Sequence, residues 1–88
     1  MKIKDGFILR DVGGKTFVVA VGELSKKFKG MITLNETGKL IWQELTKGAS
    51  AEEIVDKIMA EYECDDKNLV QSDVNTFIAK LERDGVLE

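Results

Sequence analysis

Histidine and proline are absent from the 88 residues, and cysteine occurs once, at Cys64. Without histidine, neither a Ser-His-Asp triad nor a Cys/His zinc site can be assembled. A single thiol cannot close an internal disulfide, and with no histidine to serve as base we expect Cys64 to be a passive loop residue. These absences predict no catalytic residue, no metal site and no cofactor, so the chain does not have the pattern of an enzyme.

Long apolar runs are also missing. No stretch approaches the roughly 20 apolar residues of a membrane span, and residues 1–7 lack the apolar segment of a signal peptide. The net charge of −3 opposes binding to nucleic acid, which needs a basic surface. The sequence therefore predicts one cytoplasmic domain, residues 1–88, that binds neither membrane nor nucleic acid.

The first third of the chain has the pattern of a β-hairpin followed by a short strand. Phe7–Val12 and Lys15–Val21 are rich in aromatic and β-branched residues, and Gly13-Gly14 separates them with the residues that a tight two-residue turn requires. A polar connection over residues 22–30 then leads to the short apolar segment Met31–Leu34. We expect these segments to form a three-stranded antiparallel sheet.

From residue 35 onward the apolar residues recur with helical spacing. Asn35 is a candidate cap for a first helix, Ser50 with Glu53 forms a capping box for a second, and Asn68 with Gln71 suggests one for a third. Trp42 falls on the apolar stripe of the first helix and is expected in the core. We expect Val86 and Leu87 to fold back on the core as a short tail. Element order predicts an α+β, winged-helix-like domain: a three-stranded antiparallel sheet followed by three helices.

Met31–Leu34 is short, uncharged and free of proline, so it lacks the usual protection of an edge strand. Lys26, Lys27 and Lys29 precede it, and they are suited either to prevent self-pairing or to attract an acidic extended peptide. This combination indicates peptide binding by strand addition. The alternative is that the strand simply completes the sheet.

Three stretches together resemble one protein family. They are LNETGKLIW (residues 34–42), the helix IVDKIMAEY (54–62) and DVNTFIAKLERDGVLE (73–88). Their combination is similar to the PqqD family, named for a small protein of pyrroloquinoline quinone biosynthesis, over nearly the whole chain. The resemblance implies a non-catalytic recognition element that binds the leader of a ribosomally made precursor peptide. It also implies presentation of that peptide to a modifying enzyme, often a radical SAM protein.

The resemblance further implies that the leader adds as an antiparallel strand in the groove between the third strand and the third helix. Carried onto this chain, the strand contacts are Met31, Ile32, Thr33 and Leu34. The third helix has two candidate shoulders beside the core face that carries Val74 and Leu81. We favour the shoulder with an apolar floor, so the helix residues assigned to peptide binding are Gln71, Val74, Asn75, Ile78 and Glu82. The other shoulder carries Asp73, Lys80 and Asp84.

Two other interpretations of the same fold stay open. A winged helix can bind DNA, although residues 69–84 carry more acidic than basic side chains, which opposes that role. The domain can also be a structural module that binds only its partner enzyme. The precursor, its modification and the enzyme are not specified by the sequence, and an exposed edge is compatible with a monomer or a weak homodimer.

Overall fold

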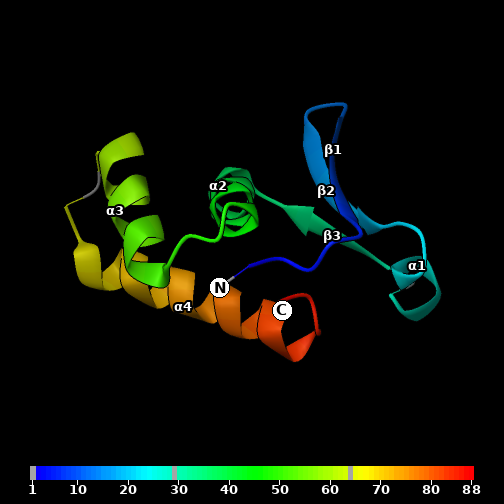
Figure 1. Cartoon of the computed structure of the whole chain (residues 1–88). Coiled ribbons are helices and arrows are strands. Elements are labelled where there is room, and N and C mark those ends of the chain that lie inside the picture. Colours follow the sequence, from blue (N-terminus) through cyan, green and yellow to red (C-terminus); the bar gives the residue numbers. More distant parts are fainter. Residues whose placement is uncertain (1, 29, 64) are drawn as a thin grey trace.

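The computed structural model describes residues 2–28, 30–63 and 65–88 of the chain. Lys29 and Cys64 lie outside this description. Figure 1 shows the sheet beside the helices, with α4 running beneath them. The elements, in chain order, are β1 (Phe7–Val12), β2 (Lys15–Ala20), α1 (Leu24–Lys27), β3 (Met31–Leu34), α2 (Glu36–Thr46), α3 (Ala51–Glu61) and α4 (Lys67–Arg83).

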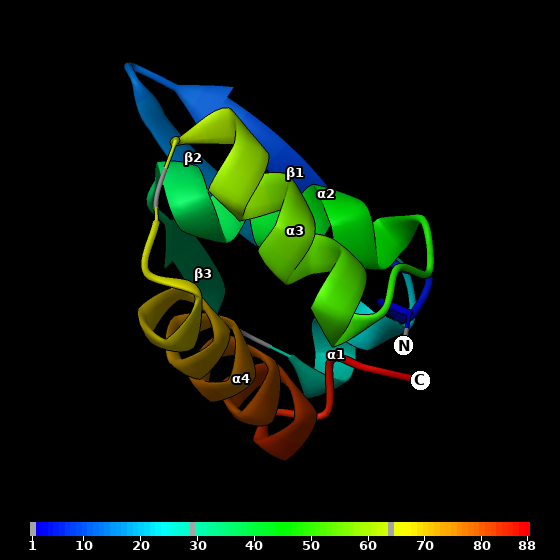
Figure 2. The ribbon, with the colours of Figure 1, turned by 90° about the vertical axis from the view of Figure 1, so that its left-hand side faces the viewer.

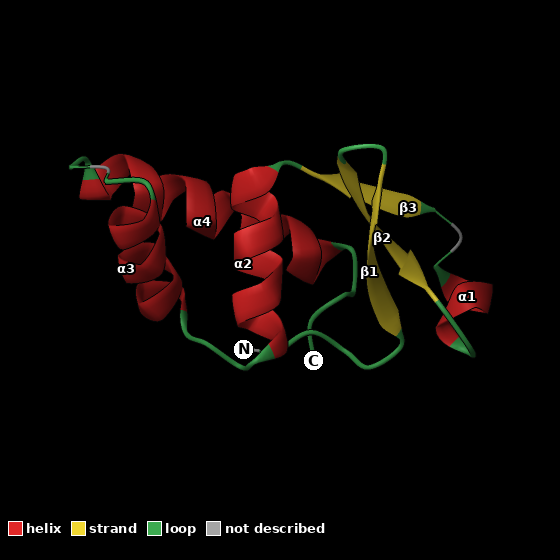
Figure 3. Cartoon of the chain, turned by 90° about the horizontal axis from the view of Figure 1, so that it is seen from above, coloured by secondary structure: helices red, strands yellow, loops and turns green. Residues whose placement is uncertain are grey.

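The sheet is antiparallel with the order β1-β2-β3 (Figure 3), which confirms the predicted architecture. Gly13 and Gly14 connect β1 to β2 with φ angles of 59° and 80°, the left-handed values of a type I′ turn. This turn sets the register, because it makes Val12 and Lys15 direct partners across the hairpin. β2 ends at Ala20, one residue earlier than the sequence pattern suggested.

The starts of two helices follow the predicted caps. The Asn35 side chain accepts a hydrogen bond of 2.7 Å from the Gly38 N–H at the start of α2, and Ser50 with Glu53 forms the predicted capping box of α3. The prediction for α4 was wrong. Asp66, not Asn68, is its N-cap and accepts a 3.1 Å hydrogen bond from the Leu69 N–H, so the helix starts earlier.

The connection between β2 and β3 contains a helical turn that the sequence analysis did not predict. It is α1, closed by a 2.8 Å hydrogen bond from the Phe28 N–H to the Leu24 carbonyl. The Ser25 hydroxyl also donates to the Gly22 carbonyl at 2.6 Å. Phe28 meets the Phe7 ring edge-to-face at 5.3 Å, which fixes α1 against the first strand.

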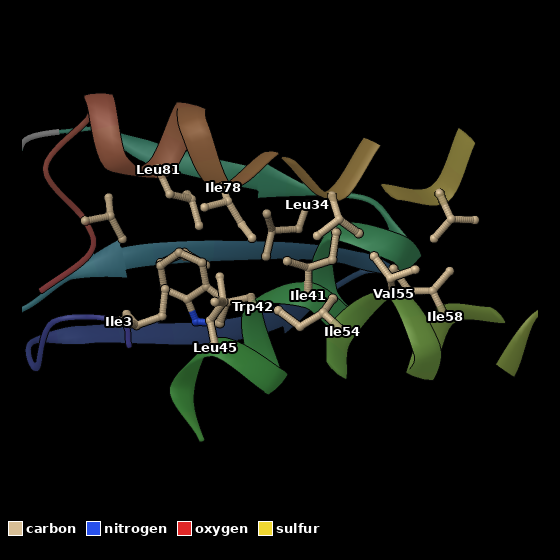
Figure 4. Packing of buried hydrophobic residues seen from close by; sticks show 14 residues of the cluster. Ile3, Leu34, Ile41, Trp42, Leu45, Ile54, Val55, Ile58, Ile78 and Leu81 are labelled. Carbon is tan, nitrogen blue, oxygen red and sulfur yellow. The ribbon is translucent and has the colours of Figure 1, made fainter. Parts of the chain in front are cut away.

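The core lies between the helices and the inner face of the sheet. Figure 4 shows Trp42 of α2 beside Leu45 and Ile3. Trp42 is 2% exposed and meets the Phe7 ring at 5.9 Å, which confirms its predicted place in the core. The buried apolar side chains are Ile3, Val18, Leu34, Ile41, Trp42, Leu45, Ile54, Val55, Ile58, Val70, Val74, Ile78, Leu81 and Val86.

Both ends of the chain take part in this core. Val86 is fully buried, and Leu87 forms an isolated antiparallel bridge with Ile3. The tail therefore folds back as predicted. Its partner is the segment before β1, whose contribution to the core the sequence analysis had not identified.

Candidate functional site: an open sheet edge and its groove

The third strand forms an edge of the sheet. β3 pairs with β2 only, and Figure 2 shows it on the side of the sheet that lies toward α4. Among the described residues, no backbone hydrogen bond beyond those of the β2–β3 ladder involves Met31–Leu34. The tail does not cover this edge, because it bonds instead to the N-terminal segment through Lys4 N–H to Val86 carbonyl, 2.9 Å. The edge is thus available to another strand.

The hairpin turn determines which main-chain groups of β2 point toward β3. In a two-residue loop, the flanking residues Val12 and Lys15 form a hydrogen-bonded pair. Hydrogen-bonded and non-hydrogen-bonded pairs alternate along an antiparallel ladder. The N–H and C=O groups of Thr16 and Val18 therefore point away from β1 and toward β3.

The same alternation identifies the free groups on β3. Leu34 and Ile32 are the register partners of Thr16 and Val18, so their main-chain groups bond to β2. Those of Met31 and Thr33 point outward. An added strand would therefore form its main-chain hydrogen bonds with Met31 and Thr33, whereas the side chains of Ile32 and Leu34 turn toward the core.

A groove runs along this edge between β3 and the last turns of α4. At its α1 end, an open depression of about 490 Å³ has Phe28, Met31 and Ile32 as its apolar members. Lys27 projects from the α1 side, and Lys80 and Asp84 from α4. The walls are therefore charged, and between them lie the half-buried side chains of Phe28 and Ile32 and the exposed side chain of Met31.

A second depression, of about 340 Å³, lies where β3 passes into α2. Phe77 and Asp73 of α4 face Ile41 and Gly38 of α2 across it. Gly38 is buried in this contact, since a Cβ at this position would lie 3.3 Å from Phe77 Cε2 and 3.2 Å from Asn35 Oδ1. The absence of a side chain at Gly38 therefore lets α2 and α4 approach closely at this end of the groove.

The four strand residues assigned from the sequence differ in exposure. Met31 is 61% exposed, Thr33 is exposed, Ile32 is half-buried, and Leu34 is 6% exposed and belongs to the core. Met31, Ile32 and Thr33 all line the depression next to α1. Leu34 ends the strand, and its buried side chain has no surface for a peptide.

The helix residues favoured by the sequence lie mostly away from this groove. Val74 is fully buried and Ile78 is 7% exposed, so both are core residues and Val74 offers no side-chain surface to a peptide. Gln71 lines a depression against Glu52 and Val55 of α3, on the far side of α4.

The other two favoured residues lie on the same side of α4 as Gln71. Asn75 and Glu82 are exposed, and their spacing from Gln71 places them on its side of α4. The favoured shoulder is therefore the one that meets α3. On the other shoulder, Lys80 and Asp84 face β3 and Asp73 faces the start of α2. The reason is packing: α3 occupies the Gln71 side, which helical periodicity alone does not reveal.

Three groove residues were not assigned to the site by the sequence analysis. Phe28 and Lys27 belong to α1 and its C-terminal cap, and the KKFK run was the available signal for them. Phe77 is half-buried at the boundary of the α4 core stripe. In the described part of the chain, no group of three or more potential ligands could hold a metal ion, and no helix has the length and apolar content to cross a membrane.

The chain is similar to one protein family and to two solved structures. The family model for coenzyme PQQ synthesis protein D (PqqD) matches residues 7–87. A structure described as TbiB1 in complex with the TbiA(beta) leader peptide is 30% identical, with a TM-score of 0.78, covering 100% of this chain and 95% of that one. Lasso peptide synthetase B1, complexed with the leader peptide, has the same fold at 18% identity, with a TM-score of 0.76 and coverages of 97% and 93%. A search among curated protein sequences finds no match.

Proposed function

The chain belongs to the PqqD family, and on that premise we propose that it binds the leader segment of a ribosomally made precursor peptide by strand addition at β3. It has no catalytic activity of its own in this proposal. It holds the precursor for a modifying enzyme, which we expect to be a radical SAM protein in the cytoplasm. The domain, residues 1–88, acts as a monomer or a weak homodimer.

One observation carries the proposal: the β3 edge has free main-chain groups and a groove beside it. A guest strand would gain hydrogen bonds to Met31 and Thr33, and its alternate side chains would enter the groove. The comparison with TbiB1, whose structure contains a leader peptide, supports a leader peptide as the guest.

We assign the peptide contacts to both walls of the groove. On the strand side they are Met31–Leu34, as expected from the sequence, with the main-chain hydrogen bonds formed by Met31 and Thr33. On α4 we replace the Gln71 shoulder by the residues that face β3 or the start of α2: Asp73, Phe77, Lys80 and Asp84. Ile78 and Val74 support this wall from the core.

The affinity of such a site depends on main-chain bonds more than on buried area. Only four residues of β3 are available to pair, so the interface is at the small end of specific complexes, about 1,000 Å² in total. Interfaces of that size range from micromolar to much tighter, according to how well side chains fit and how ordered the groove is beforehand.

The experiment is an NMR titration of the isotope-labelled full chain with the leader of the precursor peptide encoded beside its gene. We expect chemical-shift changes at residues 31–34 and at the groove side of α4, which is Asp73, Phe77, Lys80 and Asp84, with residues 7–12 of β1 unaffected. The Gln71 side of α4 is an internal control. If that leader at millimolar concentration leaves residues 31–34 unchanged, the proposal is wrong.

A further inference from the structure

The α1 end of the groove has a charge pattern of its own. Lys27 and Lys80 stand on opposite walls of the depression whose apolar members are Phe28, Met31 and Ile32. Asp84 lies one helical turn beyond Lys80 and is the single acidic side chain among the described residues that line this depression. The basic charge at this end is therefore in excess, although the whole chain has a net charge of −3.

Neither lysine has a partner within the described residues. Three other lysines form ion pairs: Lys39 with Asp11 at 2.9 Å, Lys47 with Glu44 at 3.1 Å, and Lys26 with Glu23 at 3.8 Å. Lys27 and Lys80 form none with the described residues, even though Asp84 is close along the helix. Two unpaired ammonium groups thus face a groove that a guest strand would cover.

Covering these groups has a consequence for selection. A guest strand removes water from both walls, and an ammonium group that loses water without gaining a partner is destabilised. A guest carboxylate restores a charge-assisted hydrogen bond, whereas a guest lysine or arginine adds repulsion. The groove should therefore discriminate by charge as well as by shape.

The spacing of a β-strand adds a second requirement. Successive side chains of the guest point to opposite faces, so positions i and i+2 enter the groove together. One of these side chains can cover Phe28 and Ile32 while its neighbour two residues away reaches the lysines.

We propose that Lys27 and Lys80 are specificity-determining residues, which select leader peptides with an acidic and an apolar side chain two positions apart. This inference rests on the proposed function, because it concerns the guest of the same β3 edge. It adds the chemical class of the peptide.

The test is selection of a displayed library of random 12-residue peptides on the immobilised full chain. The same selection is run on the double variant Lys27→Glu/Lys80→Glu and on Lys57→Glu, which reverses an exposed charge on α3, away from this groove. Selected peptides are then measured against Thr33→Pro, which removes an outward N–H of β3.

We expect peptides selected on the natural chain to be enriched in Asp or Glu two positions from an apolar residue. The double variant should bind them about tenfold more weakly, because two partly exposed ion pairs contribute up to about fivefold each. Its own selection should favour Lys or Arg, and Lys57→Glu should behave like the natural chain.

The remaining outcomes distinguish a failure of the charge selection from a failure of strand addition. Peptides that lose binding to Thr33→Pro but show no acidic enrichment would overturn the charge selection and leave strand addition intact. An acidic preference that survives in the double variant would overturn the charge selection in the same way. If no selected peptide is sensitive to Thr33→Pro, the proposed function itself fails and the specificity inference with it.

Discussion

The two edges of the sheet are built in opposite ways. β1 has six residues and carries Arg10 and Asp11, and Asp11 accepts hydrogen bonds from the Thr16 hydroxyl at 2.5 Å and from Lys39 of α2 at 2.9 Å. β3 has four residues and no charged side chain. Charge is a common device by which natural sheets prevent pairing at an edge. One edge of this sheet has that device and the other has a groove instead.

The two edges also differ at equivalent residues. By the alternation that begins at the Gly13-Gly14 turn, the main-chain groups of Asp11 point outward at the β1 edge, as those of Thr33 do at the β3 edge. At one edge the outward position has an ion-paired carboxylate, and at the other it has a small neutral side chain. The difference indicates that an exposed strand is suited to binding when it is uncharged and has a wall beside it.

The largest difference between the two edges should come from proline at Thr33 of β3, compared with proline at Asp11 of β1. Thr33→Pro removes the outward N–H of β3 that would donate to a guest carbonyl. A guest carbonyl left unpaired costs about 1–3 kcal/mol, so leader affinity should fall roughly tenfold to a hundredfold. Asp11→Pro should leave the affinity unchanged, because no guest pairs with β1. Isothermal titration with the leader measures both affinities.

Thr33→Val is the matched control for that comparison, since it keeps the N–H and the β-branched shape. Ile32→Pro provides the opposite control, because its N–H bonds to β2 and its loss should lower the free energy of unfolding. Equal loss of leader affinity in Asp11→Pro and Thr33→Pro would mean that the two edges do not differ in function.

A smaller effect is expected where the hairpin closes. Gly14 has a φ of 80°, and alanine in that left-handed conformation costs about 1–2 kcal/mol. Gly14→Ala should therefore lower the free energy of unfolding by that amount, measured by urea denaturation, while leader affinity in the folded protein stays the same. A weakened affinity would show that the β1 hairpin takes part in binding.

The smallest effect concerns pH. The pKa of Asp11 is lowered, first by the hydrogen bond from Thr16 and then by that from Lys39. A lowered pKa in the folded state stabilises the fold above the unfolded pKa, near 4. This contribution disappears as the pH falls through the folded pKa.

Thr16→Val should raise the pKa of Asp11 toward its ordinary value more than Lys39→Met does, as observed by NMR of the carboxyl carbon. The described residues of β3 contain no titratable side chain, so acid should loosen the β1 edge first. An unchanged Asp11 pKa in Thr16→Val would contradict this account of how the β1 edge is held.

Local signals made most of the fold predictable. Gly13-Gly14 specifies a turn by its backbone freedom, and Ser50 with Glu53 specifies a helix start through two reciprocal hydrogen bonds. Asp66 was missed because two residues near the start of α4 are both good caps, and only the folded backbone shows which side chain meets an N–H. The one-turn helix α1 was missed because four residues are too few for a periodic pattern.

The candidate site, which stays a proposal, was predictable in part. The four strand residues could be singled out because an uncharged edge strand is unusual in sequence as well as in structure. The wall of α4 could not, since periodicity places Gln71 and Lys80 on equivalent shoulders of one apolar stripe. Only the position of α3, against Gln71, decides between them. That contact depends on how whole helices pack, so no local pattern encodes it.

Amide hydrogen exchange at Thr33 tests the central claim most directly. In the free protein its N–H should exchange much faster than those of Ile32 and Leu34, which bond to β2. With saturating leader, Thr33 should become as protected as its neighbours, while the Asp11 amide on β1 remains unchanged. A Thr33 amide that is already protected in the free chain, or that stays exposed at saturation, would contradict strand addition at this edge.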